Sequence, residues 1–345
     1  MDKIIPFTIS DLAKVTNHRS GEIKFGEKMI VIPKEENQID YIKNCEAKYV
    51  LFGIPEDVGI RANFGRPGAA SAWKSAISGI ANIQHNRFCK GYDIIVLGTL
   101  DVSEEMESAK DLDFLRTIDR QKLSALVEKI DKEVVHIVTT IIKCGKIPII
   151  IGGGHNNAYG NIKGTALGLG KPINAINFDA HSDFRIIEGR HSGNGFSYAF
   201  EEGFLSKYFI FGLHENYTSK KVLDILKKLE ERVAFNTYDQ IKVQQNKSFN
   251  GELYTALDFI KDNHYGIEID LDALPNIASS AMTMSGFSVE ELRQFVYFFG
   301  NNKNAAYLHI CEGAPDLGED KNNHLIGKLI GYLVTDFIKS RKEIL

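Results

Sequence analysis

The chain has 345 residues, of which 43% are hydrophobic and 25% charged, a composition typical of a globular enzyme with a large core. Its formal net charge is −4 and no block of Lys and Arg stands out, which argues against a nucleic-acid-binding protein. The first 15 residues mix charges with short apolar runs, so we expect a cytoplasmic protein without a signal peptide or membrane helix. The four cysteines are scattered, and we expect reduced thiols.

Short apolar runs of strand length alternate with segments that carry apolar residues at helical spacing. The predicted strands are residues 48–53, 93–97, 147–151, 173–178, 208–212, 233–236, 266–270 and 305–310. The clearest predicted helices are residues 121–144, 219–232, 288–299 and 323–339. This alternation predicts an α/β fold with three layers, α/β/α, around a central, mostly parallel eight-stranded sheet.

The chain shows no internal linker, because no stretch rich in Pro, Ser or one sign of charge divides it. We therefore expect residues 46–345 to form a single hydrolase domain and residues 1–45 to form an N-terminal extension. In a parallel sheet, functional groups gather beyond the carboxyl ends of the strands. Catalytic or binding residues are therefore expected at those ends.

Three of the predicted strands end in clusters of side chains that can bind metal ions. Gly-Gly-Gly-His155 follows one strand, Asp179-Ala-His-Ser-Asp183 follows another, and Asp270-Leu-Asp272 closes a third. Residues two apart in an extended segment point the same way, so each cluster turns its carboxylates and imidazoles to one face. We expect the three clusters to meet at one edge of the sheet.

The mixture of ligands indicates the kind of metal. One imidazole with several carboxylates around each ion suits Mn²⁺ better than a metal that prefers thiolates. Two ions about 3.5–4 Å apart can share bridging carboxylates and one hydroxide. Taken singly, a histidine after glycines or an Asp-x-Asp pair is more often a loop or cap residue. Three such clusters, each after its own apolar strand, favour a metal site.

These segments resemble the metal-binding motifs of the ureohydrolase superfamily, which includes arginase, agmatinase and formimidoylglutamase, over about residues 48–335. The resemblance implies an arginase-like fold with two Mn²⁺ ions per subunit. It places one ion on His155, Asp179, Asp183 and Asp270, and the other on Asp179, His181, Asp270 and Asp272. Asp179 and Asp270 would bridge the two ions.

The resemblance also implies a mechanism, in which a metal-bridging hydroxide attacks an amidine or guanidine carbon and a proton reaches the departing amine. Asp183 resembles the carboxylate that orients the nucleophile and relays this proton. Glu312 follows the last predicted strand and resembles the glutamate that pairs with the cationic amidine or guanidinium. The alternative for Glu312 is a surface acid at the end of a strand.

Several features resemble formimidoylglutamases in particular. The loop after the first predicted strand carries Asn63 and Arg66 in a pattern similar to the N-x-G-R-x-G-A signature of that group. Arg185 suits a substrate with an extra carboxylate, because a guanidinium binds a carboxylate through two hydrogen bonds. An ordinary surface ion pair is the alternative for Arg185. His155 follows three glycines, where arginases and agmatinases generally have Gly-Gly-Asp-His.

A last feature lies in the segment at residues 192–196, Ser-Gly-Asn-Gly-Phe. Phe196 stands where arginases carry a proton-shuttling histidine, which argues against an arginase. Asn194 in the same segment is expected to contact the substrate, although Asn194 and Gly195 replace the Thr-Pro of the formimidoylglutamase pattern. Asn156 likewise replaces a glutamate that many formimidoylglutamases have there.

Together the motifs predict hydrolysis of N-formimidoyl-L-glutamate to L-glutamate and formamide, a late step of histidine breakdown. The expected partners are a small-molecule substrate and further copies of the same chain in a homo-oligomer. One alternative is another ureohydrolase that releases urea from arginine, agmatine or a guanidino acid; another is a catalytically silent family member with a binding or regulatory role. His191, His214 and His309 are further candidates for proton carriers, although a lone histidine is usually structural.

Overall fold

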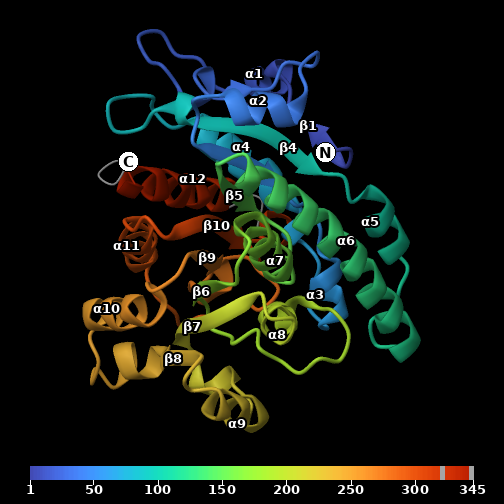
Figure 1. The fold of residues 1–345 in the computed structure, drawn as a ribbon, viewed down its shortest axis with the longest axis vertical. Helices are drawn as coiled ribbons and strands as arrows, with labels where there is room; N and C mark the ends of the chain where they lie inside the picture. Colours follow the sequence, from blue (N-terminus) through green and yellow to red (C-terminus); the bar gives the residue numbers. More distant parts are fainter. Residues whose placement is uncertain (319–322, 342–345) are drawn as a thin grey trace.

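A ten-stranded sheet runs through the centre of this computed structural model, which describes residues 1–318 and 323–341 (Figure 1). Its strands are β1 (Ile4–Pro6), β2 (Ile30–Val31), β3 (Tyr49–Gly53), β4 (Ile94–Leu100), β5 (Ile147–Ile151), β6 (Ile173–Phe178), β7 (Leu205–Leu213), β8 (Val233–Thr237), β9 (Tyr265–Asp270) and β10 (Ala305–Cys311). They lie in the order β1-β4-β3-β5-β10-β9-β6-β7-β8, and β2 also pairs with β4. Of these strands, β1 alone runs antiparallel to its neighbour.

The eight predicted strands are all present, as β3 to β10, and the prediction of a mostly parallel α/β sheet is confirmed. The strands β1 and β2 extend the sheet beyond the eight predicted strands. They contain 3 and 2 residues, which is too few to show the periodicity from which strands are predicted.

Helices cover both faces of the sheet. They are α1 (Ile9–Val15), α2 (Gln38–Asn44), α3 (Val58–Ala62), α4 (Ala72–Ala81), α5 (Ser103–Ala109), α6 (Thr117–Lys143), α7 (Asn157–Leu169), α8 (Gly195–Glu201), α9 (Lys220–Lys228), α10 (Phe249–Ile260), α11 (Val289–Gly300) and α12 (Asn323–Ser340). Figure 1 shows α11 and α12 on one side of the strands and α6 and α7 on the other. The four predicted helices correspond to α6, α9, α11 and α12.

The core is divided into two clusters by the sheet itself. Ile149 and Ile151 of β5 belong to the cluster beneath α4, α10, α11 and α12, whereas Ile150 belongs to the cluster beneath α6, α7 and α8. Successive side chains of a strand point to opposite faces, so a strand that is buried on both sides must be apolar throughout. This is why β5 is a nearly unbroken run of isoleucine.

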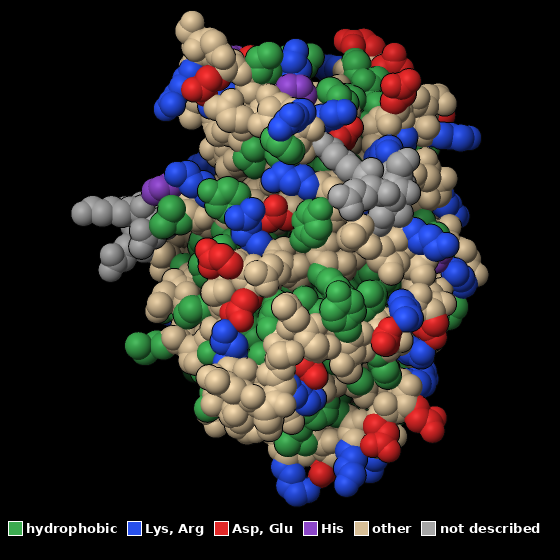
Figure 2. Space-filling model, turned by 90° about the vertical axis from the view of Figure 1, so that its left-hand side faces the viewer, with side chains coloured by type: hydrophobic (Ala, Val, Ile, Leu, Met, Phe, Trp, Pro, Cys, Tyr) green, Lys and Arg blue, Asp and Glu red, His purple; other side chains and the backbone are tan. Residues whose placement is uncertain are grey.

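The first 45 residues pack against the rest of the chain. Both β1 and β2 pair with β4, and Leu12, Phe25 and Met29 are buried in the core cluster beneath α4. The domain boundary at residue 45 stays a prediction. None of the described helices is long and apolar enough to cross a membrane. On the face shown in Figure 2, basic and acidic side chains are interspersed.

The strand order explains why distant motifs meet. Strands β5, β10, β9 and β6 are consecutive neighbours in the sheet and parallel to one another. Near their carboxyl ends, Ile310 pairs with Ile151, and Cys311 pairs with Asp270. The residues that follow these strands therefore converge on one edge of the sheet, as the rule for parallel sheets predicts.

Candidate metal centre

The turn after β5 brings His155 to this edge. Gly152 and Gly153 have φ angles of 88° and 77°, which residues with a side chain rarely adopt. A Cβ atom on Gly153 would also lie 2.3 Å from Nδ2 of Asn157. The turn therefore requires these glycines, and it places the buried His155 just before α7.

Four of the predicted ligands form one compact group. Nδ1 of His155 lies 2.8 Å from Oδ2 of Asp183 and 3.3 Å from Oδ2 of both Asp179 and Asp270. The ligand atoms of the four residues all lie within 4.8 Å of one another. His155, Asp179 and Asp270 are buried, and Asp183 is partly exposed. The group could hold one divalent cation.

A second group adjoins the first and shares Asp179 with it. Nδ1 of His181 lies 3.3 Å from Oδ2 of Asp272 and 3.5 Å from Oδ1 of Asp179. Asp179 therefore turns one oxygen to each group, the arrangement that a bridging carboxylate needs. Asp270, which the sequence predicts in both groups, lies in the first one. Its Oδ1 accepts the backbone N–H of Asp272 at 2.8 Å.

The donor set of these groups fits a cation. Nδ1 of His155 and Oδ1 of Asp272 are buried without a well-aligned hydrogen-bond partner among the described residues, a costly state that a bound ion would relieve. Burial and the charges of Asp272 and Asp179 raise the pKa of Asp270 well above its usual range. Four close carboxylates thus repel one another unless positive charge is placed between them.

Glu312 faces the same groups from the loop after β10. Its Oε1 accepts the backbone N–H of His155 at 2.9 Å, and its Oε2 accepts the hydroxyl of Ser280 at 3.3 Å. Burial and the negative charge of Asp272 raise the pKa of the Glu312 carboxyl to about 8. Only 4% of the residue is exposed, so the alternative of a surface acid is wrong.

A cavity of about 500 Å³ opens over the two groups. Its wall includes His181, Asp183, Asp270, Asp272 and Glu312, together with Asn63 and Arg185. Nη1 of Arg185 donates to Oδ1 of Asn63 at 2.7 Å, and Nη2 donates to Oε1 of Glu188 at 2.9 Å. Arg185 thus forms a partly exposed ion pair with Glu188, as its alternative interpretation predicts, and its guanidinium lines the same cavity as the candidate metal ligands.

The structure places two predicted substrate-binding residues elsewhere. Neither Arg66 nor Asn194 is among the described residues that line the cavity. Nη2 of Arg66 donates to the backbone oxygen of Ser279 at 3.1 Å, next to the cavity residue Ser280. Oδ1 of the buried Asn194 accepts from Nη1 of Arg190 at 2.7 Å. Substrate contact by these two residues stays a prediction.

A comparison with protein families decides the assignment. The family model described as arginase family matches residues 47–335. The chain belongs to the arginase family. It is therefore a hydrolase that acts on carbon–nitrogen bonds, and the ureohydrolase resemblance of the metal motifs is confirmed.

Several relatives of this arginase-family chain, similar in sequence or in structure, are formimidoylglutamases. A formimidoylglutamase from Chromobacterium violaceum is 27% identical over 246 residues, which cover 70% of this chain and 71% of the relative. The crystal structure of formimidoylglutamase from Bacillus subtilis aligns over 95% of both chains with a TM-score of 0.74 and 18% identity. A structure of formiminoglutamase from Trypanosoma cruzi with Mn²⁺ aligns over 92% of this chain and 98% of that one, with a TM-score of 0.70 and 16% identity. The two structures establish the fold.

Sequence reasoning missed part of the cavity wall of this family member. Tyr217 and Lys221, which follow β7, line the cavity, and the ring of Tyr217 stacks on His181 with centroids 5.6 Å apart. The available signal was their position after a predicted parallel strand, the same rule that located the metal ligands. Glu188 lines the cavity as well; nothing in its sequence context marks it.

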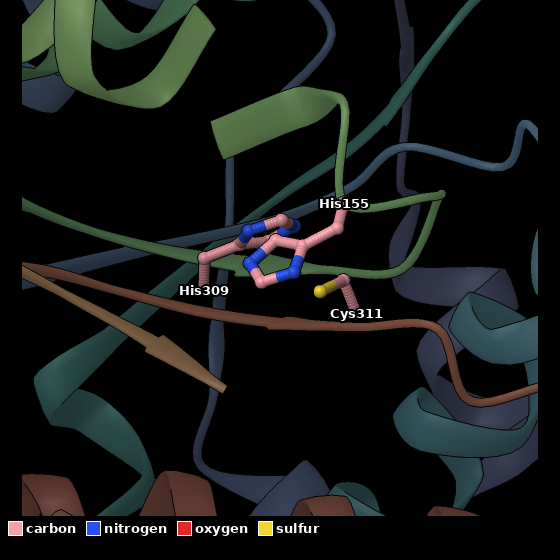
Figure 3. Close-up of side chains that lie close together, drawn as sticks. All are labelled: His155, His309 and Cys311. Atoms are coloured by element: carbon pink, nitrogen blue, oxygen red, sulfur yellow. The ribbon is translucent and has the colours of Figure 1, made fainter. Parts of the chain in front are cut away.

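The three lone histidines lie outside this wall. None of His191, His214 and His309 is among the described residues that line the cavity. Nδ1 of His191 accepts the backbone N–H of Gly193 at 3.1 Å, and His214 stacks on Tyr238 with centroids 4.6 Å apart. His309 lies in the interior near His155 and Cys311, as Figure 3 shows.

Proposed function

We propose that this arginase-family hydrolase cleaves N-formimidoyl-L-glutamate to L-glutamate and formamide in histidine breakdown, with two Mn²⁺ ions per subunit. The observation that carries the proposal is the pair of ligand groups joined through Asp179, beneath a cavity that also presents Arg185. Similarity to formimidoylglutamases supports the choice of substrate.

Two divalent ions bound there would lower the pKa of a water molecule and polarise the carbon under attack. The chain's own residues would supply the rest. Asp183 lies 2.8 Å from Nδ1 of His155 and lines the cavity, and a carboxylate in this place could take up a proton and pass it to the departing amine. An amidinium beside the buried Glu312 carboxylate would form a charge-assisted hydrogen bond, which favours the ionised form of Glu312.

The other end of the substrate would contact Arg185. A carboxylate of the glutamate part can accept two parallel hydrogen bonds from its guanidinium if it replaces Glu188, which accepts from Nη2, while Asn63 accepts from Nη1. An uncharged or cationic tail, as in agmatine, would gain nothing from this contact. The geometry therefore favours an acidic amidine substrate.

We further propose that residues 46–345 form the hydrolase domain, with residues 1–45 as an N-terminal extension, and that the protein works as a homo-oligomer in the cytoplasm. Family resemblance supports this proposal. Light scattering of the purified protein tests the oligomer, because a mass of about 38.6 kDa, that of one chain, would contradict it.

A product assay tests the function. The purified protein would be loaded with Mn²⁺ and offered formimidoylglutamate, arginine, agmatine and guanidinobutyrate in separate reactions. Release of formamide and glutamate from the first compound, with no urea from the others, is the expected result. Urea from a guanidino compound would indicate another ureohydrolase, and no product from any of them would indicate a silent family member.

A further inference from the structure

A buried glutamate lies beneath the candidate metal groups. Glu268 of β9 precedes Asp270 by two residues, on the same face of the strand. Its Oε1 accepts the hydroxyl of Tyr307 at 2.6 Å, and its Oε2 contacts Nδ1 of His309 at 2.5 Å. His309 is the β10 residue directly opposite Glu268 in the sheet. All three side chains are inaccessible to solvent.

A carboxylate at a fully buried position such as Glu268 is costly unless it is paired. Glu268 and His309 form a fully buried pair, with Oε2 of the glutamate 2.5 Å from Nδ1 of the histidine. A buried ion pair is often no more stabilising than apolar side chains of the same volume. Neighbouring positions of β9 and β10 hold isoleucine and leucine. A role beyond packing would account for the charged residues.

The orientation of the His155 ring indicates such a role for Glu268. Nδ1 of its ring faces the carboxylates of the first ligand group, at 2.8 to 3.3 Å. Nε2, at the far side of the ring, lies 3.6 Å from Oε2 of Glu268 and has no hydrogen-bond partner among the described side chains. A shift of about 0.5 Å would bring the pair within hydrogen-bond range. Glu268 thus lies behind the ring, opposite the ligand group.

Cys311 also lies beside the ring, as Figure 3 shows. Its S–H donates to the backbone oxygen of Ile269 at 3.5 Å. A neutral thiol is a weak acceptor. The carboxylate of Glu268 is therefore the stronger partner for the N–H of His155.

We propose that Glu268 is a positioning residue for the metal centre: it accepts the Nε2–H of His155 and so keeps Nδ1 free to bind the cation. A metal-binding histidine commonly donates its other N–H to a carboxylate, which fixes the ring and makes it a better ligand. Tyr307 and His309 in turn hold Glu268 in place. The inference rests on the metal pair of the proposed function and is independent of the substrate.

The test is the substitution Glu268→Gln with Mn²⁺ binding as the readout. Glutamine has the same size, can still bond Tyr307 and His309, and removes the negative charge that faces His155. We expect affinity to fall by about 10- to 100-fold at the site that contains His155, with little change at the site of His181. At a Mn²⁺ concentration that fills both wild-type sites, equilibrium dialysis should then give one ion per chain, and electron paramagnetic resonance should show a single ion in place of a coupled pair.

Glu56→Gln is the matched control. Glu56 is equally buried and accepts the backbone N–H of Gly154 at 3.0 Å in the same turn, and none of its hydrogen bonds with the described residues involves the ring of His155. This variant should keep two ions. Equal loss of metal in both variants, or two ions bound with wild-type affinity in Glu268→Gln, would overturn the proposal.

A second variant, Tyr307→Phe, tests the proposal even if Glu268→Gln does not fold. It removes the hydroxyl that donates to the Glu268 carboxylate and keeps the aromatic ring of residue 307. It should weaken the same site several-fold, and wild-type affinity would count against the proposal. Wild-type protein that binds two ions but releases no formamide would refute the substrate assignment alone, whereas wild-type protein that binds no ions would overturn both proposals.

Discussion

At the scale of single residues, the site places strained backbone beside its carboxylates. Asp183 and Glu312 have φ angles of 43° and 61°, and they are two of the five non-glycine residues with positive φ in the described chain. A residue held in this region costs roughly 1–3 kcal/mol and persists only where its surroundings enforce it. Here both angles direct a carboxylate to the cavity, so the strain lies where the proposed proton transfer and amidine binding occur.

Arg185→Ala should weaken substrate binding more than it slows turnover. Loss of a charge-assisted pair costs about 1.5–3 kcal/mol, so we expect the KM for formimidoylglutamate to rise by about 10- to 100-fold while kcat changes little. Steady-state kinetics with the Mn²⁺-loaded protein measure this. Arg116→Ala, which changes a mostly exposed arginine paired with Asp119, should leave both constants unchanged. An unaltered KM in Arg185→Ala would exclude a role in recognition.

His191 should make the metal-free protein less stable in acid. Burial and the neighbouring Arg185 lower the pKa of His191 to about 4, whereas an unfolded chain has a histidine pKa of about 6.5. The unfolded state therefore binds more protons between these pH values, so stability falls as pH decreases through this window, by on the order of 3 kcal/mol. Protonation would also remove the acceptor of the Gly193 N–H.

Urea unfolding at a series of pH values checks this prediction. In His191→Asn the amide oxygen can still accept the Gly193 N–H but cannot titrate, so its unfolding midpoint should depend less steeply on pH. The control, His136→Asn, alters an exposed histidine of α6 and should keep the wild-type slope. Parallel curves for wild type and His191→Asn would show that His191 does not contribute.

At the scale of elements, the sequence predicts the strands that carry the site better than the walls of the cavity. Residues 147–151 and 173–178 coincide with β5 and β6, because mostly apolar runs before glycine or aspartate suit strands that are buried on both faces. Lys221 and Arg185 line the same cavity only because tertiary packing brings their segments together. Glu268 and His309 interrupt the apolar pattern of their strands, which is visible in the sequence. Their contact with each other follows only from the pairing of β9 with β10.

The close contact between α4 and α12 predicts that Gly79→Ala destabilises the protein, although alanine has a higher helix propensity than glycine. A Cβ atom on Gly79 would lie 2.0 Å from the backbone oxygen of Gly327, and backbone atoms cannot rotate away. Gly79→Ala should therefore destabilise the protein by about 1–3 kcal/mol, although alanine at an open helical position would add about 0.5–1 kcal/mol of stability. Urea midpoints measure the change. Ser78→Ala, at the exposed neighbouring position, is the control, and a higher midpoint for Gly79→Ala would contradict the close contact.

At the scale of the whole molecule, the sheet brings together charges that are far apart in the sequence. Asp179, Asp183, Asp270 and Asp272 come from two strand ends and meet with His155 from a third. An unfolded chain keeps them apart and hydrated, so the folded metal-free state bears their mutual repulsion. Ions that bind only the folded state would reverse this cost through mass action. Stability and metal occupancy should therefore rise together.

Removal of metal should lower the melting temperature of the wild-type protein by several degrees, since an ion at 100 times its Kd contributes about 2.7 kcal/mol.

In Asp270→Asn the melting temperature should depend much less on metal than in the wild-type protein. Burial and the neighbouring Asp272 raise the pKa of Asp270, so its charge destabilises the metal-free fold at neutral pH, and asparagine can still accept the N–H of Asp272. We expect the metal-free variant to melt no lower than the metal-free wild type, and Mn²⁺ to raise its melting temperature much less. Scanning calorimetry with chelator and with Mn²⁺ separates the two effects, and an equal rise in both proteins would place the ions away from Asp270.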